Sequence, residues 1–150
     1  MSIFLQGVQG ANIMNFVRRN TEGMDKLNTN QLSTVLDRWT PENPNSNVPR
    51  LVSGSDNPNL AISERFVEDA SYLRVQNVSL GYNLPPSLLN KIKVSRLRIY
   101  ATIQNLITIT NYSGYDPEIG SFNQQALLMN IDNGRYPMPR TYTFGLNLEF

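Results

Sequence analysis

The chain has 150 residues, with 13 Lys and Arg, 12 Asp and Glu, and neither Cys nor His. The missing residue types exclude a disulfide framework, a Cys or His zinc site, a thiol nucleophile and a Ser-His-Asp triad. A net charge of +1 gives no electrostatic footprint for nucleic acid. The first residues lack a signal-peptide pattern, and no run approaches the roughly 18 apolar residues of a membrane helix. We therefore expect no cofactor, and carboxylate chemistry is the enzymatic option left open.

A first strand is predicted at residues 2–8, and a long polar stretch from 10 to 70 follows it. Between residues 11 and 27, an apolar stripe predicts a short helix with Asn12 as its N-cap. The stripe consists of Ile13, Met14, Phe16 and Val17. Further along, prolines alternate with asparagines, and this composition does not sustain long regular elements. Such a stretch is far longer than an ordinary connection inside a compact domain.

Three longer strands are predicted after residue 70, at 71–83, 96–110 and 140–150. The second alternates apolar and polar residues with a period of two over its whole length. The first changes phase near Gln76 and Asn77, which predicts a β-bulge. The last has an unbroken apolar stripe, which consists of Tyr142, Phe144, Leu146, Leu148 and Phe150.

The length of these strands and of their connections indicates a membrane β-barrel. Strands of globular proteins usually have about 5–6 residues, whereas residues 96–110 span roughly 45–50 Å and, tilted by about 45°, cross a bilayer core. Connections 10–70 and 111–139 are long and connection 84–95 is short, as external loops and periplasmic turns are. The predicted fold is all-β, with about four antiparallel strands of a large transmembrane barrel and long extracellular loops.

Several motifs point to one family. They are Ser71–Tyr82 (SYLRVQNVSLGY), Leu97–Tyr100 (LRIY) with Gln104–Leu106 (QNL), Gly114–Glu118 (GYDPE) and the terminal Tyr136–Phe150, joined by Phe4–Gly7 (FLQG) and Arg38–Pro44 (RWTPENP). In this order they resemble the C-terminal part of SusC/RagA-type TonB-linked outer-membrane proteins, which are TonB-dependent receptors. The resemblance covers nearly the whole chain.

The resemblance implies a barrel of about 22 strands with an N-terminal plug, which imports glycans or peptides with a SusD-like surface lipoprotein. The chain matches only the C-terminal part, so we expect a fragment that does not transport alone and is not an enzyme. The implied partners are outer-membrane lipid, the remainder of the barrel and the plug, the lipoprotein, TonB through the missing N-terminal part, the insertion machinery and the substrate. The implied location is the bacterial outer membrane.

Two groups of residues are candidates for contact with partners. The apolar stripe of the last strand resembles the terminal strand that the outer-membrane insertion machinery recognises by strand pairing. Aromatic side chains in the predicted external loops are candidates for contact with a ligand or partner. They are Trp39, Tyr112, Tyr115 and Phe122.

Polar candidates carry less weight. Asp116, Glu118 and Asp132 have the chemistry for a cation or for glycoside hydrolysis, but carboxylates in turns more often accept backbone N–H groups. We therefore assign no catalytic or metal-binding residue. Arg96, Arg98 and Gln104 share the polar face of their strand and would line a barrel lumen.

Two other functions compete with the barrel segment. A soluble β-sandwich that binds carbohydrate would also have alternating strands and aromatic loops, but residues 10–70 would have to cover its apolar face. A hydrolase that used Asp116 and Glu118 would need a cleft that nothing in the sequence requires.

Overall fold

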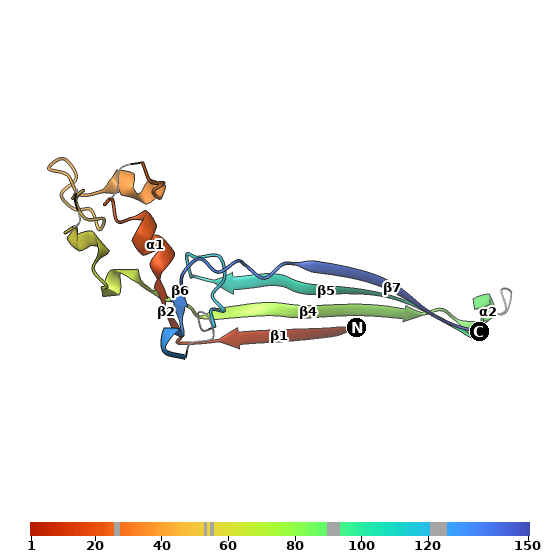
Figure 1. Ribbon diagram of the computed structural model, residues 1–150. Helices are drawn as coiled ribbons and strands as arrows, with labels where there is room; N and C mark the ends of the chain where they lie inside the picture. The colour runs from red at the N-terminus through yellow and green to blue at the C-terminus, as the bar shows by residue number, and fades with distance from the viewer. Residues whose placement is uncertain (26–27, 53, 55, 90–93, 121–125) are drawn as a thin grey trace. The chain divides into compact units, whose positions relative to one another are not determined.

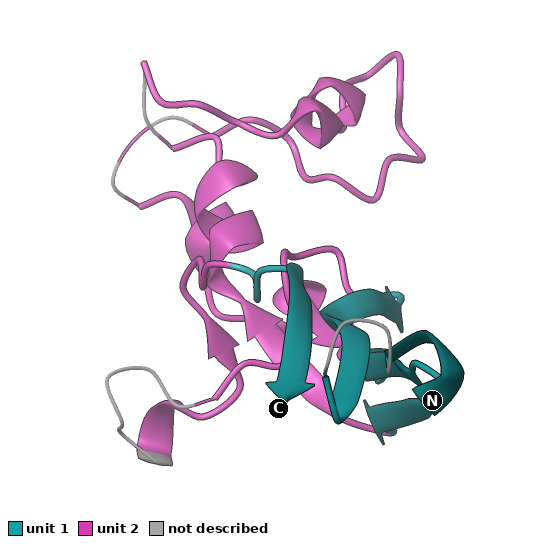
Figure 2. Cartoon of the chain, turned by 90° about the vertical axis from the view of Figure 1, so that its right-hand side faces the viewer, with its two compact units in different colours: residues 1–9, 71–111, 137–150 teal, residues 10–70, 112–136 magenta. Residues whose placement is uncertain are grey.

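The computed structural model describes residues 1–25, 28–52, 54, 56–89, 94–120 and 126–150. The chain forms two compact units, which Figure 2 distinguishes by colour. Unit 1 comprises residues 1–9, 71–111 and 137–150, and unit 2 comprises residues 10–70 and 112–136. In the described part of the chain, no helix is long and apolar enough to cross a membrane.

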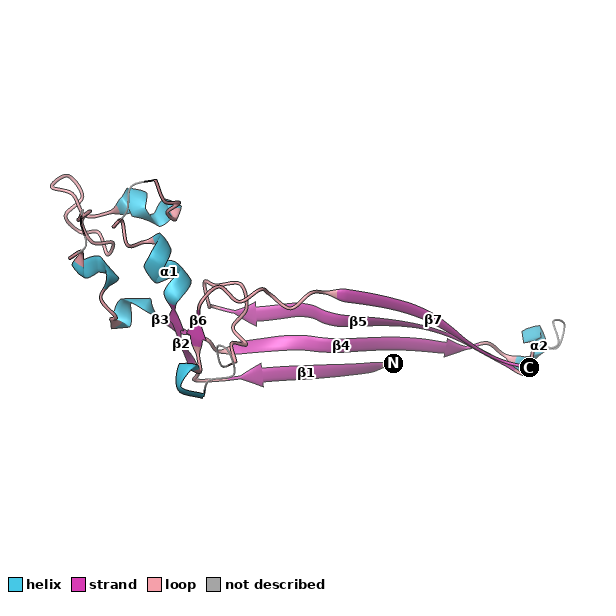
Figure 3. Cartoon of the chain, viewed as in Figure 1, coloured by secondary structure: helices cyan, strands magenta, loops and turns pink. Residues whose placement is uncertain are grey.

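Unit 1 is a four-stranded antiparallel sheet in the order β1-β4-β5-β7 (Figures 1 and 3). The strands are β1 (Ser2–Val8), β4 (Tyr72–Asn83), β5 (Arg96–Thr110) and β7 (Thr141–Glu149), and the short helix α2 (Pro86–Leu89) follows β4. β1 and β5 have the bounds that the sequence predicts, while β4 and β7 are one residue shorter at one or both ends. Period-two alternation therefore locates β5 and β7 by itself.

β4 is irregular where the sequence predicts a bulge. Its register with β5 shifts between Val75 and Asn77, and its register with β1 shifts at the same place. Asn105 on β5 has a φ of 53° near this shift. In a regular strand, Leu73 and Val75 would lie on the face opposite to the apolar residues that follow the bulge. The extra residue of a bulge reverses the alternation, so that all of these side chains lie on one face. The predicted bulge is confirmed.

Unit 2 is built around a three-stranded sheet in the order β3-β2-β6. β2 (Asn12–Asn15) pairs antiparallel with β3 (Val67–Asp69) and parallel with β6 (Ile131–Asp132). The helix α1 (Phe16–Thr21) follows β2, and the described residues of the unit also form the 3₁₀ turns η1 (Ser33–Asp37), η2 (Pro58–Leu60), η3 (Glu64–Phe66) and η6 (Ala126–Leu128). Ile13, Ala70 and Tyr112 form its small buried core, with Ala11 and Ile119 against it.

The helix predicted between residues 11 and 27 is wrong in its extent and its cap. Residues 12–15 form the strand β2, and the helix occupies only Phe16–Thr21. Asn15 is the N-cap, because its side-chain oxygen accepts a 2.8 Å hydrogen bond from the Arg18 N–H. The strand prevails because β2 has partners on both sides and buries Ile13.

Candidate functional site

One face of unit 1 is apolar across all four strands. Register pairing aligns its side chains in rows, because directly paired residues share a face. The rows across β4, β5 and β7 are Val78–Ile103–Tyr142, Leu80–Ala101–Phe144 and Tyr82–Ile99–Leu146, and Ile3 of β1 extends the first row. The stripe on β7 is the most exposed part, with Phe144 at 80% and Phe150 at 88% of full exposure. A face of this kind requires an apolar cover.

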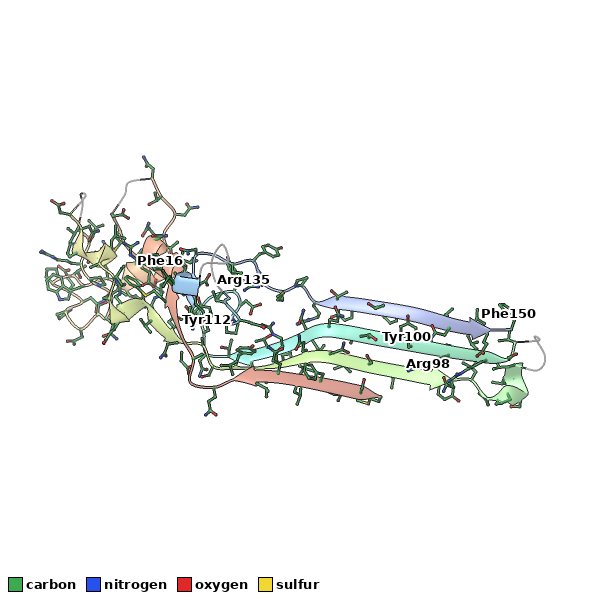
Figure 4. All side chains as sticks on the ribbon, turned by 60° about the horizontal axis from the view of Figure 1, so that its bottom comes forward. Phe16, Arg98, Tyr100, Tyr112, Arg135 and Phe150 are labelled. Carbon is green, nitrogen blue, oxygen red and sulfur yellow. The ribbon has the colours of Figure 1, made fainter. Side chains whose placement is uncertain are left out.

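The opposite face of unit 1 is polar. The hydroxyl groups of Ser79 and Thr102 lie 3.1 Å apart and share a hydrogen bond across β4 and β5. Arg98 and Tyr100 project from β5 on this face (Figure 4). Arg98 lines two shallow hollows of about 340 and 290 Å³, the first with Arg96, Asn147, Leu148 and Glu149. Arg96, Arg98 and Gln104 are exposed, as expected for residues of a solvated wall.

The aromatic candidates of unit 2 fall into different environments. Trp39 is 41% exposed and Tyr115 is 74% exposed, so both rings are accessible. Tyr112 is buried, and its hydroxyl donates a 2.6 Å hydrogen bond to Oδ2 of Asp132. Burial and the neighbouring Asp132 carboxylate raise the pKa of Tyr112. Tyr112 thus has a structural contact that the sequence did not reveal, and Phe122 lies outside the described residues.

Two of the three carboxylates of the 111–139 connection, those of Asp116 and Asp132, accept backbone N–H groups. Oδ1 of Asp116 accepts the Glu118 N–H at 2.9 Å, and Oδ1 of Asp132 accepts the Gly134 and Arg135 N–H groups. Both aspartates are buried. Among the described residues no group of three or more acidic side chains is placed to hold a metal ion. The two aspartates therefore shape turns.

The sequence did not reveal a buried ionic cluster in unit 2. Oε2 of Glu22 lies 3.0 Å from Nε of Arg18 and 2.9 Å from Nη2 of Arg65, and Glu22 is almost fully buried. Arg18 also reaches Oε1 of Glu68 at 3.3 Å. The i,i+4 spacing of Arg18 and Glu22 on one helix is a signal that sequence carries, but Arg65 and Glu68 come from a distant segment.

Glu68 connects the cluster to residues 112–136, the second of the two chain segments, or excursions, that form unit 2 (the first is 10–70). Glu68 accepts hydrogen bonds from the Ser113 N–H at 3.0 Å and from the Ser113 hydroxyl at 2.9 Å, and from Nδ2 of Asn15 at 3.2 Å. Burial by itself would raise the pKa of Glu68, but the bonds from Ser113 and Arg18 outweigh it and hold the pKa below its ordinary value. Glu68 thus links three segments of unit 2.

Comparisons with known proteins identify similar chains. No family model matches the sequence. TonB-dependent receptor P3 of Formosa agariphila is 36% identical over 154 residues, which cover 100% of this chain and 15% of that receptor. TonB-dependent receptor SusC of Bacteroides thetaiotaomicron is 37% identical over 94 residues, which cover 59% of this chain and 8% of SusC.

Solved structures agree with the sequence comparison. A structure of the RagAB peptide transporter matches 99% of this chain at 30% identity with a TM-score of 0.79. The RagAB peptide importer in its closed-closed state matches at 31% identity with a TM-score of 0.81. In both cases the match covers 15% of the solved chain. The chain thus spans about 15% of the length of these similar proteins.

Proposed function

The chain belongs to the SusC/RagA family of TonB-dependent receptors, and from this premise we propose that it is a C-terminal wall segment of an outer-membrane importer. The family consists of transporters and not of enzymes. In the proposal, β1, β4, β5 and β7 are neighbouring strands of a transmembrane barrel of about 22 strands. The two excursions that form unit 2 are external, and connection 84–95 is periplasmic. The segment does not transport by itself.

The exposed apolar face of unit 1 is the observation that carries this proposal. Long antiparallel strands with one apolar and one polar face are what a barrel wall needs, because lipid covers one side and water or protein the other. The rows on β4, β5 and β7 supply the lipid side. The polar face with Arg96, Arg98 and Gln104 supplies the lumen side. The open edges of β1 and β7 require further strands, since lipid offers no hydrogen bonds to a free edge.

The proposal also assigns partners. The exposed stripe from Tyr142 to Phe150 is the strand that the insertion machinery recognises. Trp39 and Tyr115 are candidates for contact with the substrate or with a SusD-like lipoprotein. TonB acts through an N-terminal part of the receptor. The cargo is a glycan or a peptide, and the similarity to the RagAB peptide importer favours a peptide.

Transplantation tests the proposal directly. The 150-residue chain replaces the matching section of the Formosa agariphila P3 receptor, and the product is followed in outer-membrane fractions. We expect the chimera to reach the outer membrane folded, whereas the receptor that lacks this section does not. A chimera that behaves like the deletion variant contradicts the proposal.

Two matched substitutions in the chimera test the direction of the faces. Leu146→Asp places a charge on the apolar face, and Asn147→Asp places the same charge on the polar face one residue later. A charge that faces lipid is destabilising, by about 2–4 kcal/mol for Lys or Arg at the bilayer midplane and by less for Asp, so we expect a measurable loss of folded receptor for Leu146→Asp and none for Asn147→Asp. Equal effects of the two variants would contradict the assignment of faces.

The soluble alternative predicts a different behaviour of the chain alone. Without detergent, the exposed apolar face should drive the 150-residue chain to aggregate. A monomeric chain that melts cooperatively in water would instead support a soluble β-sandwich module.

A further inference from the structure

Tyr100 lies between two glycines in one row of the four-stranded sheet. Register pairs Gly81 of β4 with Tyr100 of β5, and Tyr100 with Gly145 of β7. A Cβ atom at position 145 would overlap with Cζ and with the hydroxyl oxygen of Tyr100. The Tyr100 ring therefore occupies the space that any larger residue at position 145 would need. Alternation along β5 places Tyr100 on the same face as Arg98, and Figure 4 labels both side chains.

The second glycine has a different neighbour. A Cβ atom at position 81 would lie 2.9 Å from Nε and from Nη2 of Arg98. These atoms are at the far end of a flexible side chain that is exposed on the polar face. Arg98 can move away at little cost, whereas the Tyr100 ring is rigid and has only two rotatable bonds. The same glycine-to-alanine change should therefore have different consequences on the two sides of Tyr100.

The apolar pattern of β7 leaves the strand register ambiguous. A slip by one residue would turn the whole apolar set to the other face, which is strongly disfavoured. A slip by two residues keeps every apolar side chain on the apolar face, because Tyr142, Phe144, Leu146 and Leu148 repeat with a period of two. Hydrophobic burial alone thus does not distinguish the native register from a slip by two.

Gly145 removes this ambiguity. It is the single glycine of β7, and a slip by two would place Thr143 or Asn147 opposite Tyr100. Both residues carry a Cβ atom where the ring lies. We propose that Tyr100 and Gly145 form a register lock, which selects one pairing of the final strand from the set that the apolar pattern permits. The lock goes beyond the proposed function, and it holds whether or not the receptor transports.

Disulfide trapping measures the register, because the chain contains no cysteine of its own. The 150-residue chain is folded in detergent micelles and treated with a mild oxidant. Thr102→Cys with Thr143→Cys reports the native register, since these residues are direct partners. Thr102→Cys with Thr141→Cys reports a slip by two. In the otherwise native sequence we expect the first pair to form a disulfide and the second to form almost none.

Substitutions in the two reporter backgrounds test the lock. Gly145→Ala should lower the yield of the 102–143 disulfide at least about fivefold, and the matched Gly81→Ala should leave it nearly unchanged. Tyr100→Ala should make the 102–141 disulfide detectable, because the slip is no longer blocked. Adding Tyr100→Ala to Gly145→Ala should return the native yield to that of Tyr100→Ala alone.

Three results would overturn the lock. Gly145→Ala could leave the native yield unchanged, or Gly81→Ala could reduce it equally, or Tyr100→Ala could fail both to rescue Gly145→Ala and to permit the slipped disulfide. A native chain that forms no 102–143 disulfide would also contradict the register on which the lock rests. Transplantation into the P3 receptor tests the proposed function separately, so the two ideas can fail independently.

Discussion

Glu68 joins segments of unit 2 that are distant in sequence. Its carboxylate accepts hydrogen bonds from Arg18, Asn15 and Ser113, which come from both excursions of the chain. The bonds from Ser113 and Arg18 favour the charged form and hold the pKa of Glu68 below its ordinary value, against the effect of burial. A carboxyl group with a lowered pKa in the folded state stabilises that state above its unfolded pKa. Its contribution is lost as the pH falls through the folded pKa.

Lowering the pH should therefore destabilise unit 2 as the pH falls below about 4.3, the ordinary glutamate pKa. Denaturant unfolding of the chain in detergent micelles can be followed through Trp39, the single Trp of the chain, which lies in unit 2. Glu68→Gln should cost about 1–3 kcal/mol at pH 7 and should flatten the acid dependence. Parallel pH curves for the variant and the native chain would show that Glu68 does not carry this dependence.

At the scale of elements, a single residue, Asn15, sets the boundary between β2 and α1. Asn15 ends the strand, caps the helix and donates to Glu68 and Ser113. Asn12, which the sequence indicates as the cap, lies instead at the start of β2 and is exposed. The helix has only six residues and depends on its cap and its tertiary contacts.

Asn15→Ala should consequently destabilise unit 2 by about 1–2 kcal/mol, the range of a lost N-cap. Asn12→Ala is the matched control and should cost less than about 0.5 kcal/mol, as exposed substitutions usually do. The unfolding free energy of each variant is measured through Trp39. A larger loss of stability for Asn12→Ala than for Asn15→Ala would contradict Asn15 as the N-cap and support Asn12, the cap that the sequence predicts.

A strand of this chain is predictable from the sequence where its own residues alternate between apolar and polar over many positions. β5 alternates over its whole length, so its bounds follow from the sequence without knowledge of its partners. β2 carries four residues, and its apolar Ile13 and Met14 fit a helix as well as a strand. Its pairing with Val67–Asp69 and Ile131–Asp132 decides the outcome. Such distant partners are invisible to local periodicity.

At the scale of the whole molecule, the net charge of +1 conceals a strong segregation. Unit 1 carries six Lys and Arg against one acidic residue, and unit 2 carries seven against eleven. The units therefore have net charges of +5 and −4. The charged residues can be counted in the sequence, but the opposite net charges become visible only when residues 10–70 and 112–136 are recognised as one folded unit. Composition alone suggested long polar loops between strands.

In unit 1, the long connections leave from one end of the sheet and the short connection leaves from the other end. Val8, Tyr72 and Thr110 pair at one end, where both excursions of unit 2 begin or return. At the other end the Ser95 N–H donates to the Glu149 carbonyl, close to connection 84–95 and the terminal Phe150. If the sheet spans a membrane, as proposed, the chain leaves the sheet toward residues 10–70 and 112–136 on one side and toward connection 84–95 on the other.

Cysteine labelling of intact cells tests this arrangement in the P3 chimera, freed of other cysteines. Glu42→Cys and Leu127→Cys lie in the two excursions of unit 2, and Ser87→Cys lies in α2. A membrane-impermeant maleimide should label the first two variants in intact cells, because both positions are external in the proposed orientation. It should label Ser87→Cys only after the outer membrane is opened. Labelling of Ser87→Cys in intact cells, or protection of only one excursion, would contradict the proposed orientation of the strands.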